Sequence, residues 1–510
     1  MKKLICVLLC AAMLISGCSS EEFVFLSCDL DSNIKTLDPQ FAESKSEQNI
    51  IANIFEGLVK RNEMGEELPA CAEKWEITQG GTVYTFTLRD DIFWSDGEKV
   101  TAEDFAFAFE RMFSPDTPSP FAGRYAAVEN SLSVMAGEMD KRALGVKAED
   151  ERTLVITLSA AENGFLTILA QTPAMPCRRD FFGEQMGRYG LDKRYLLTNG
   201  NFELYSWGSE TVKIRRSEHH RNQALVDGVD FNLAQDDNIG RFTSGATDVC
   251  LVGRGNVESV SGKAVYDRTW ALIINPASEA FTDKDIRMSV IGAVREKFSD
   301  RTPQNSRVSD GLIPPAAEIG AINYRTEVGS VPQAKFPEDA RAAMLEALER
   351  LETDRIKGAT LLVCDGEAET AMGGAMQRVW QDTLSTYFNM QPLNEETLTA
   401  RVKSGNFDIA IAPVFAENGD KTLGLSMLSS VIGQSDEMGI GAVINTAVNT
   451  PRDTEAAKLL WEAEKRITEE YLAMPLYDTP TVFACAEDIS GVWYEPATGL
   501  IYFNDAATAK

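Results

Sequence analysis

The alternation of apolar and polar residues along the chain predicts strands and helices in mixed order. Residues 84–88 alternate between apolar and polar side chains, which is typical of a strand with one buried face. The segments 212–215 and 407–411 have the same strand character. Asp96-Gly97 follows the first strand and predicts a turn.

Other stretches follow the helical period. Thr101, with Asp104 three residues later, forms a start that resembles a capping box. Apolar residues then recur on one helical face, namely Phe105, Phe109, Met112 and Phe113. Two further helices are predicted over 338–352 and from Asp453 or Thr454 onward. This mixture of elements indicates an α/β or α+β protein.

The N-terminal residues have the pattern of an export signal. Two lysines precede an apolar run over 4–15, which is too short for a membrane-spanning helix of about 20 residues. The run ends in Ile15-Ser16-Gly17-Cys18, which resembles the lipobox of bacterial lipoproteins. That resemblance implies a signal peptide at 1–17, lipid on Cys18 and a lipidated tether at 18–30. An ordinary signal peptide that contains a cysteine is the alternative.

The charge excludes whole classes of partner. Of the 510 residues, 77 are Asp or Glu and 49 are Lys or Arg, so the net charge is −28. Removal of residues 1–17 takes away two lysines and no acidic residue, which brings the net charge to −30. Nucleic acid and anionic lipid headgroups require basic patches, so we exclude them as main partners. A hydrophobic content of 44% is enough for a large core.

Sequence signals for catalysis and metal binding are missing. The two histidines, His219 and His220, lie beside three arginines, which favours an exposed turn over a metal site. No nucleophile elbow, zinc-peptidase motif, P-loop or dinucleotide-binding glycine motif occurs. The six cysteines that follow Cys18 are scattered, which favours buried free thiols or one incidental disulfide. We therefore expect no enzyme activity, no cofactor and no metal.

Several short motifs, in a fixed order, resemble one family. The most distinctive is Phe93-Trp94-Ser95-Asp96-Gly97, followed by Val100-Thr101-Ala102-Glu103-Asp104-Phe105. Further matches are Thr36-Leu37-Asp38-Pro39, Phe55-Glu56-Gly57-Leu58, Thr198-Asn199-Gly200-Asn201-Phe202, Leu312-Ile313-Pro314-Pro315 and Met474-Pro475-Leu476-Tyr477. Together they resemble the extracytoplasmic solute-binding proteins of family 5, the oligopeptide- and dipeptide-binding lipoproteins of ABC importers. We expect Trp94, Asp96 and Thr101 to build the fold rather than to contact a ligand.

The resemblance implies an α/β fold of two lobes around a cleft. This is the type II fold of periplasmic binding proteins (cluster C) with an extra inserted domain. Domain I would combine 31–58, 180–275 and 479–510, domain II would be inserted at 59–179, and domain III would span 276–478. Crossovers near 270–276 and 478–482 would form the hinge on which the lobes close.

The resemblance also implies transport without chemistry. A peptide would lie extended between the lobes, paired through its backbone in the manner of an added strand, with its side chains in hydrated pockets. The protein would be an extracytoplasmic monomer, anchored to the cell membrane by lipid on Cys18. It would pass the peptide to the permease and ATPase subunits of an ABC transporter.

By the same resemblance, three parts of the sequence form the candidate ligand site. The cleft segments would be Glu43-Ser44-Lys45 and Phe415-Ala416-Glu417-Asn418. Glu417 would pair with the ammonium group of the peptide where the family usually has Asp, or it could be a solvated loop acid. Trp270 would line the cleft or simply pack beside the hinge. Val414 stands where the family has tryptophan, which leaves the ligand specificity open.

Other functions remain open from the sequence alone. The same fold could bind a non-peptide solute such as an oligosaccharide, an amine or a metal complex. A surface receptor that senses peptides without feeding a transporter is another alternative. An enzyme that uses two carboxylates is a third, because 77 acidic residues would hide such a pair.

Overall fold

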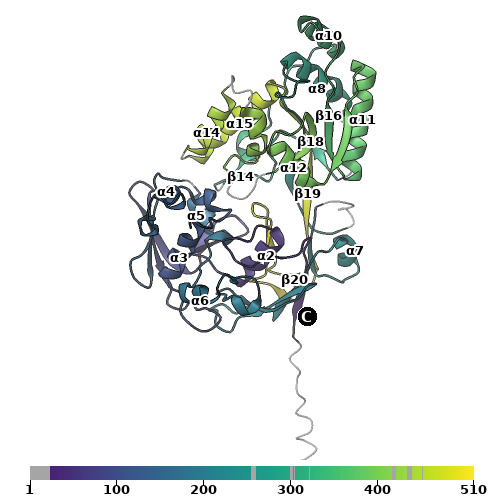
Figure 1. The fold of residues 1–510 in the computed structure, drawn as a ribbon. Coiled ribbons are helices and arrows are strands. Elements are labelled where there is room, and N and C mark those ends of the chain that lie inside the picture. Colours follow the sequence, from purple (N-terminus) through teal and green to yellow (C-terminus); the bar gives the residue numbers. More distant parts are fainter. Residues whose placement is uncertain are drawn as a thin grey trace, which may run out of the picture.

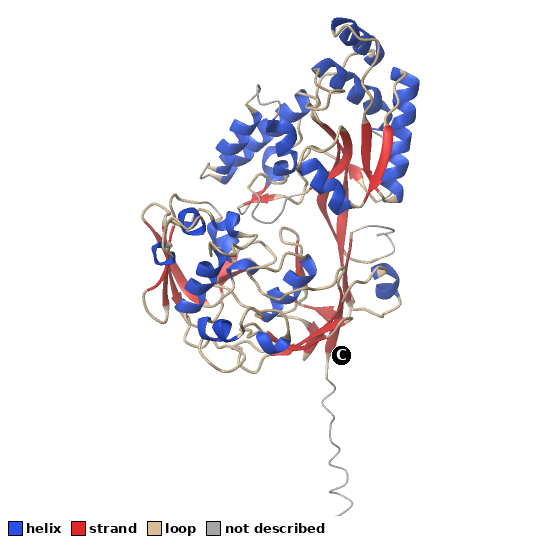
Figure 2. Cartoon of the chain, in the orientation of Figure 1, coloured by secondary structure: helices blue, strands red, loops and turns tan. Residues whose placement is uncertain are grey.

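The chain folds into two lobes joined by long strands (Figures 1 and 2). The computed structural model describes residues 23–162, 164–253, 260–298, 302–303, 305–320, 322–415, 421–433, 439–450 and 452–509. The predicted signal peptide and the predicted lipidation site, Cys18, lie outside these residues.

The first lobe contains the N-terminal half of the chain and the C-terminal tail. Its strands are β1 (Phe25–Asp29), β2 (Val59–Arg61), β3 (Glu67–Pro69), β4 (Ala72–Thr78), β5 (Val83–Leu88), β6 (Val146–Ala148), β7 (Thr153–Thr157), β8 (Phe202–Trp207), β9 (Thr211–Arg216), β10 (Gly228–Asn232), β11 (Val249–Val252), β20 (Ile489–Ser490), β21 (Trp493–Glu495), β22 (Leu500–Tyr502) and β23 (Ala507–Thr508). Its α-helices are α2 (Lys45–Ile54), α3 (Ala102–Met112), α4 (Ser131–Met135), α5 (Phe165–Leu169), α6 (Arg179–Glu184) and α7 (Asn238–Thr243).

The second lobe contains most of the C-terminal half. Its strands are β13 (Arg307–Val308), β14 (Glu318–Ile319), β15 (Ile322–Asn323), β16 (Thr360–Cys364), β17 (Asn389–Leu393) and β18 (Ile409–Val414). Its α-helices are α8 (Lys284–Phe298), α9 (Tyr324–Val328), α10 (Ala340–Arg350), α11 (Glu367–Leu384), α12 (Glu395–Lys403), α13 (Ser429–Gly433), α14 (Ile440–Val448) and α15 (Asp453–Glu469). Two long strands, β12 (Lys263–Ile274) and β19 (Ala473–Cys485), belong to both lobes.

One eleven-stranded sheet connects the lobes, in the order β17-β16-β18-β12-β19-β11-β1-β10-β9-β8, with β13 paired to β19. β12 and β19 are antiparallel to each other. The outer edge of β12 pairs with β18 in the second lobe, and the outer edge of β19 pairs with β11 in the first. Figure 2 shows these strands passing from one lobe to the other. A second sheet, β4-β5-β7-β6, stands apart in the first lobe beside α3.

Two hydrophobic cores mark where one lobe ends and the other begins. Val265 on β12 and Phe483 on β19 belong to the core of the first lobe, whereas Trp270 and Tyr477 belong to the core of the second. The crossing on β12 therefore lies between 265 and 270. This is earlier than the predicted 270–276, because the strand is already buried in the second core from Trp270 onward. The crossing on β19 agrees with the predicted 478–482.

The strongest sequence patterns are confirmed in the first lobe. The strand predicted at 84–88 is β5, and 212–215 lies within β9. α3 begins at Ala102, and the four aromatic and methionine side chains predicted for its inner face are fully buried. Asp104 Oδ2 accepts hydrogen bonds from Thr101 N at 2.9 Å and from the buried Trp94 Nε1 at 3.2 Å. As expected, this motif holds the fold together.

The predicted elements of the second lobe exist with shifted ends. The strand predicted at 407–411 is β18, which begins two residues later. The helix predicted over 338–352 is α10, which starts at Ala340 because Asp339 caps it. The Asp339 carboxylate accepts from the backbone N–H groups of Arg341 and Ala342 at 2.9 and 3.0 Å. A polar cap decides this end, which the apolar stripe does not mark.

The C-terminal end of the predicted tether is wrong. Residues Phe25–Asp29 form β1, which pairs in parallel with all of β10 and, at Cys28, with β11. Leu26 and Cys28 are buried in the core, and the Asp29 carboxylate accepts from Arg241 Nε at 2.6 Å. The strand is stabilised by partners some 200 residues away in the chain, so its own five residues give little sign of it.

The predicted exposed turn is wrong for His220, which lies in a buried cluster. Its Nε2 is 3.6 Å from Glu56 Oε1, and its Nδ1 is 3.0 Å from the Asn222 carbonyl oxygen. Arg221 donates to both carboxylate oxygens of Glu56 at 2.6 Å. The sequence suggested repulsion among neighbouring cations, but each of the three arginines pairs with its own carboxylate, namely Arg221 with Glu56, Arg215 with Glu203 and Arg216 with Asp227. His219 remains exposed, as predicted.

Acid is expected to destabilise the protein through this cluster. Burial alone would raise the pKa of Glu56, but the nearby His220 ring and the hydrogen bonds and charge of Arg221 lower it from 4.5 to about 2. Because the folded-state pKa is depressed, ionised Glu56 stabilises the fold above pH 4.5, and this contribution is lost as the pH falls toward about 2. Urea unfolding between pH 2.5 and 6 should therefore show a steeper decline for the wild type than for Glu56→Gln. Exposed Glu63→Gln is the control, and parallel profiles for wild type and Glu56→Gln would contradict the expectation.

The cysteines agree with the predicted free thiols. Cys28, Cys71, Cys177, Cys250 and Cys364 are free and buried, and Cys485 is free and partly buried. Among the described residues, none of the helices combines the length and apolarity needed to cross a membrane.

Candidate functional site

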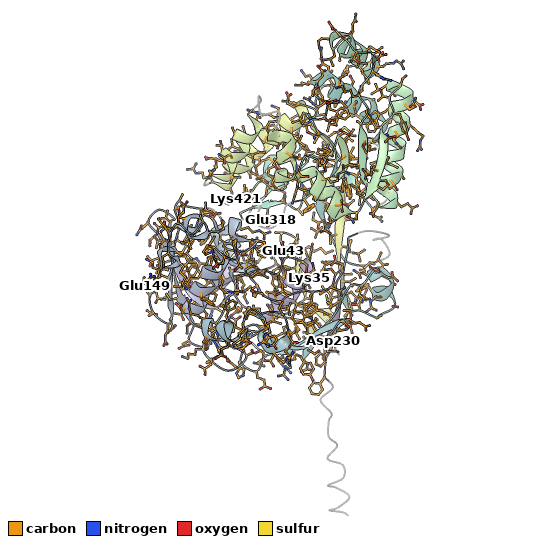
Figure 3. All side chains as sticks on the ribbon, in the orientation of Figure 1. Lys35, Glu43, Glu149, Asp230, Glu318 and Lys421 are labelled. Atoms are coloured by element: carbon orange, nitrogen blue, oxygen red, sulfur yellow. The ribbon has the colours of Figure 1, made fainter. Side chains whose placement is uncertain are left out.

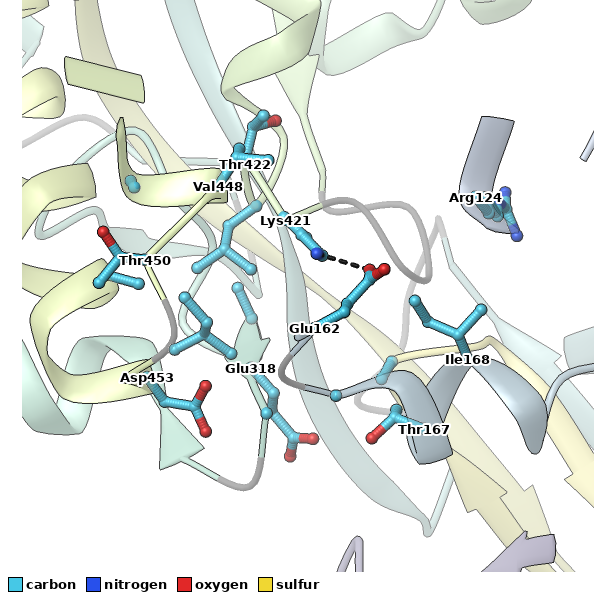
Figure 4. Close-up of a pocket in the computed structure, with 18 of the residues that line it drawn as sticks. Arg124, Glu162, Thr167, Ile168, Glu318, Lys421, Thr422, Val448, Thr450 and Asp453 are labelled. Atoms are coloured by element: carbon cyan, nitrogen blue, oxygen red, sulfur yellow. Dashed lines mark ion pairs between the residues drawn. The ribbon is translucent and has the colours of Figure 1, made fainter. Parts of the chain in front are cut away.

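A cavity of about 740 Å³ lies where the two lobes face each other (Figure 4). The first lobe contributes residues 123–127, residues 159–162 and 164–168 before and within α5, and the turn at Pro496 and Ala497. The second lobe contributes the loop 314–320, residues 421–423 and the connection between α14 and α15. This volume is typical of sites for small molecules and holds roughly 25 water molecules.

Small side chains form much of the cavity wall. They are Gly123, Ala126, Ala127, Ala160, Ala161 and Gly164 from the first lobe, and Ala316, Ala317 and Gly320 from the second. Such walls leave space that a ligand can fill with side chains of different sizes, with water in the remainder.

An ion pair joins the lobes at the cavity. Lys421 Nζ of the second lobe lies 2.5 Å from Glu162 Oε1 of the first, and a dashed line marks this pair in Figure 4. The Glu162 side chain is 8% exposed and the Lys421 side chain 33% exposed. A charge-assisted contact this far from water is stronger than an ordinary surface ion pair.

A second set of charges joins the lobes through Arg61. This side chain, 5% exposed, lies 2.7 Å from Glu495 Oε1 in its own lobe and 3.3 Å from Glu318 Oε2 in the other. Figure 3 shows Glu318 and Lys421 together on the side of the second lobe that faces the first. Charged contacts therefore tie the lobes together at two places along one cavity.

Asp267 reaches the same cavity from β12, the strand that passes between the lobes. Burial raises the pKa of its carboxyl group, and the Arg268 charge and the Thr481 hydrogen bond only partly offset this. The wall therefore includes four carboxylates (Glu162, Asp267, Glu318, Asp453) and three cations (Arg61, Arg124, Lys421).

The first predicted cleft segment lies next to this cavity but outside its wall. Ser44 caps α2 in a capping box with Glu47, so its hydroxyl is used by the fold. Lys45 Nζ donates to the Thr498 carbonyl at 2.7 Å, just beyond the turn at 496–497 that lines the cavity. Glu43 is exposed, and Figure 3 shows it on the part of the first lobe that faces the second.

The second predicted segment is described only at Phe415. Its ring lies 6.0 Å from the Arg268 guanidinium, which places it close to the crossing of β12. Ala416, Glu417 and Asn418 lie outside the described residues. Trp270 is 2% exposed, stacks on Tyr477 at 6.1 Å and donates to Thr479 Oγ1 at 3.2 Å. Of the two roles left open for Trp270, its contacts are those of packing.

Most of the residues that line the cavity were missed from the sequence. Glu162 and Lys421 come from loops and Glu318 from the two-residue strand β14, and these segments share no periodic pattern and no motif of known chemistry. The Pro314-Pro315 pair was a weak signal, since it belonged to a family match and Pro314 itself lines the cavity. Their convergence on one cavity is decided by how the lobes pack.

The chemistry available here is binding through charge, hydrogen bonds and shape. Within the described residues, no group of three or more His, Cys, Asp or Glu side chains could hold a metal ion. Two pairs of opposite charges meet across the cavity, Lys421 with Glu162 and Arg61 with Glu318.

Comparison with known proteins shows that the chain belongs to one family of bacterial binding proteins. Residues 67–435 match the description "Bacterial extracellular solute-binding proteins, family 5 Middle". The chain is 37% identical over 417 residues to the periplasmic murein peptide-binding protein MppA of Escherichia coli, covering 78% of this chain and 76% of MppA. It is 26% identical over 470 residues to the probable deoxycholate-binding periplasmic protein YgiS of Escherichia coli, covering 88% and 86%.

A solved structure has the same fold. The crystal structure of an oligopeptide ABC transporter substrate-binding domain from Bacillus anthracis matches with a TM-score of 0.74 and 22% identity, covering 96% of this chain and 99% of that chain. This likeness confirms the two-lobed α/β fold expected from the motifs.

Proposed function

Because this chain belongs to family 5 of the bacterial extracellular solute-binding proteins, we propose that it captures peptides between its lobes and delivers them to the permease of an ABC transporter. It would act outside the cytoplasm as a monomer, held at the cell membrane by lipid on Cys18. Separate ATPase subunits would drive the transport, and the protein itself would catalyse no reaction.

One observation carries this proposal, namely a cavity whose walls come from both lobes. The two lobes are joined by β12 and β19, on which they could approach and separate as rigid bodies. A solute held in the cavity would contact both lobes and so favour the closed arrangement over the open one. Closure of this kind is how a binding protein could signal to a permease that it is loaded.

Two features favour peptides over other solutes. MppA is named for murein peptides and the Bacillus anthracis structure for oligopeptides. The cavity also combines room for side chains with charged groups of both signs, which suits a zwitterionic chain.

YgiS, named for deoxycholate, favours a second candidate ligand, an amphipathic acid. The excess of carboxylates on the wall disfavours such an anion.

The ligand would extend from the cavity toward the segments predicted from the sequence. We propose Glu43-Ser44-Lys45 and Phe415-Ala416-Glu417-Asn418 as its neighbours, with Glu417 holding its ammonium group. In support, Lys45 binds the turn that leads to the cavity wall, and Phe415 lies near the crossing of β12. Trp270 would position the hinge strands by packing on Tyr477.

The domain division is part of the same proposal. Domain I would comprise 31–58, 180–275 and 479–510, domain II 59–179 and domain III 276–478. The separate sheet β4-β5-β7-β6 supports an inserted domain II, since all four strands fall within 59–179.

Mass spectrometry of the native protein would test the proposal. The mature protein with Cys18→Ala should carry short peptides from the cell or capture them from a peptide pool. Bound peptide at 100 times its Kd should add about 2.7 kcal/mol to the free energy of unfolding and raise the melting temperature. Glu417→Gln should weaken capture of peptides with a free amino end.

The outcomes separate the parts of the proposal. Equal capture by wild type and Glu417→Gln would keep the function and reject the anchor. A bile acid or sugar adduct in place of any peptide would reject the peptide function. Exposed Glu149→Gln, at the left edge of the first lobe in Figure 3, is the control and should leave peptide capture unchanged.

A further inference from the structure

The strand β12 contains a bulge at the point where it passes between the lobes. Val265 pairs with Thr481 and Arg268 with Thr479, so three steps on β12 oppose two steps on β19. The residue opposite the bulge is Pro480, which has no N–H to donate to the ladder. A bulge bends the strand and turns a side chain away from the regular alternation.

The bulge presents Asp267 to the cavity. One carboxylate oxygen, Oδ2, accepts a hydrogen bond from Thr481 Oγ1 at 2.8 Å. The other oxygen, Oδ1, is shielded from water and has no donor at full hydrogen-bond geometry, although the backbone N–H groups of Asp267 and Thr481 partly offset the rise in the pKa of the carboxyl group. A buried polar atom without a partner is rare and costly, so it calls for a physical explanation.

No cation of the protein neutralises this carboxylate by direct contact within the described residues. The neighbouring Arg268 points its guanidinium to Glu395, with distances of 2.7 and 3.0 Å to the two carboxylate oxygens. The charge of Asp267 also contributes to the raised pKa of Tyr494, whose phenol supplies no positive charge. The carboxylate at the bulge thus has no cation in direct contact with it, beside a cavity whose walls come from both lobes.

We propose that Asp267 receives a cationic group of the bound ligand, an ammonium or guanidinium group. The torsion about the Cβ–Cγ bond of an aspartate is broad, so a modest turn of the carboxylate would bring its unpartnered oxygen toward the cavity that Asp267 lines. A ligand cation there would gain a charge-assisted hydrogen bond in a site with little water. The inference rests on the proposed peptide function and adds a second acidic contact, separate from Glu417, that selects peptides carrying a positive charge.

Calorimetric titration of four peptides would test this. The peptides are Ala-Lys-Ala, its norleucine analogue Ala-Nle-Ala, and the N-acetylated form of each. Norleucine keeps the length of lysine without the charge, and acetylation removes the charge of the amino end. In the wild type, loss of the charge that Asp267 binds should weaken binding roughly tenfold or more. In Asp267→Asn, the same change in the peptide should leave its affinity unchanged.

The two sources of the cation give different results. If the lysine side chain occupies the site, the lysine and norleucine peptides should bind Asp267→Asn with equal affinity, while acetylation still weakens binding. If the amino end occupies the site, the free and acetylated peptides should bind Asp267→Asn with equal affinity, while the lysine and norleucine peptides still differ. Both differences persisting unchanged in Asp267→Asn would overturn the inference while leaving the peptide function intact. Asp478→Asn is the matched control, because this buried carboxylate on β19 is bonded to Thr269 and Arg307 away from the cavity.

Thermal unfolding provides a second measurement that needs no peptide. The pKa of Asp267 is raised in the folded state, so its contribution to stability falls as the pH rises above about 4. At pH 7 the charge should destabilise the empty protein, and Asp267→Asn should melt at a higher temperature than the wild type. A lower melting temperature would mean that the fold needs the charge, and would overturn the inference. If the wild type bound none of the four peptides, the proposed function would fail while this measurement still stood.

Discussion

Replacing Arg111 by methionine is expected to lower the free energy of unfolding by about 3–5 kcal/mol, because it leaves a buried carboxylate unpaired. Arg111 extends from α3 to Asp38, and both side chains are less than 10% exposed. Its guanidinium also donates to Gln40 Oε1 at 2.5 Å and lies 4.2 Å from the centre of the Phe182 ring. Methionine can fill the space but supplies no charge to Asp38.

A double-mutant cycle in chemical unfolding measures this effect. Asp38→Asn should recover part of the loss caused by Arg111→Met, since it removes the charge that was left alone. Arg142→Met is the control, because Arg142 pairs with Asp140 on the surface and both are exposed. Purely additive effects of the two substitutions would contradict a direct Arg111–Asp38 coupling.

Replacing Glu464 by leucine is expected to cost a similar amount, about 3–5 kcal/mol, and also to weaken ligand capture. Glu464 lies fully buried on α15. Its carboxylate accepts from Tyr324 Oη and from Arg325 Nη2, each at 2.8 Å. It also accepts from Ile313 N at 2.8 Å, directly before the loop 314–320 that lines the cavity.

The effect on ligand capture follows from the position of this loop. Without the carboxylate, the Arg325 charge and the Ile313 N–H lose their partner, and the loop that carries Glu318 loses its anchor. Melting temperature and peptide affinity should therefore both fall in Glu464→Leu. Glu462→Gln, on the same helix but paired with Arg466 nearer the surface, should change neither. Unchanged peptide affinity in a destabilised Glu464→Leu protein would mean that the loop keeps its shape without the carboxylate.

Local elements could be predicted wherever one segment holds its own signal. The alternation at 84–88 gave β5, and the spacing of Phe105, Phe109 and Phe113 gave the buried face of α3. β1 was missed because its partners on β10 lie about 200 residues away. The environment of His220 was misjudged for the same reason, since the charge of Glu56 comes from another part of the chain.

The candidate site was predictable only in outline. The motifs led to the family and to a cleft between lobes, and the expected two-lobed fold is confirmed. The cavity itself is lined mainly by residues that the motifs did not single out, including 159–162, 316–320 and 447–450. Glu162 and Lys421 are ordinary surface residues in sequence and become a contact between lobes only after folding.

The sequence by itself determined the family, the α/β class and the elements whose periodicity is local, because hydrophobic spacing and caps act over one or two turns of chain. Only the tertiary structure decided which charges meet. Arg61 finds Glu318 and Glu495, and Asp267 is left with one unpartnered oxygen at a bulge opposite Pro480. Electrostatic contacts depend on distance and burial, which are set when segments far apart in the chain pack together.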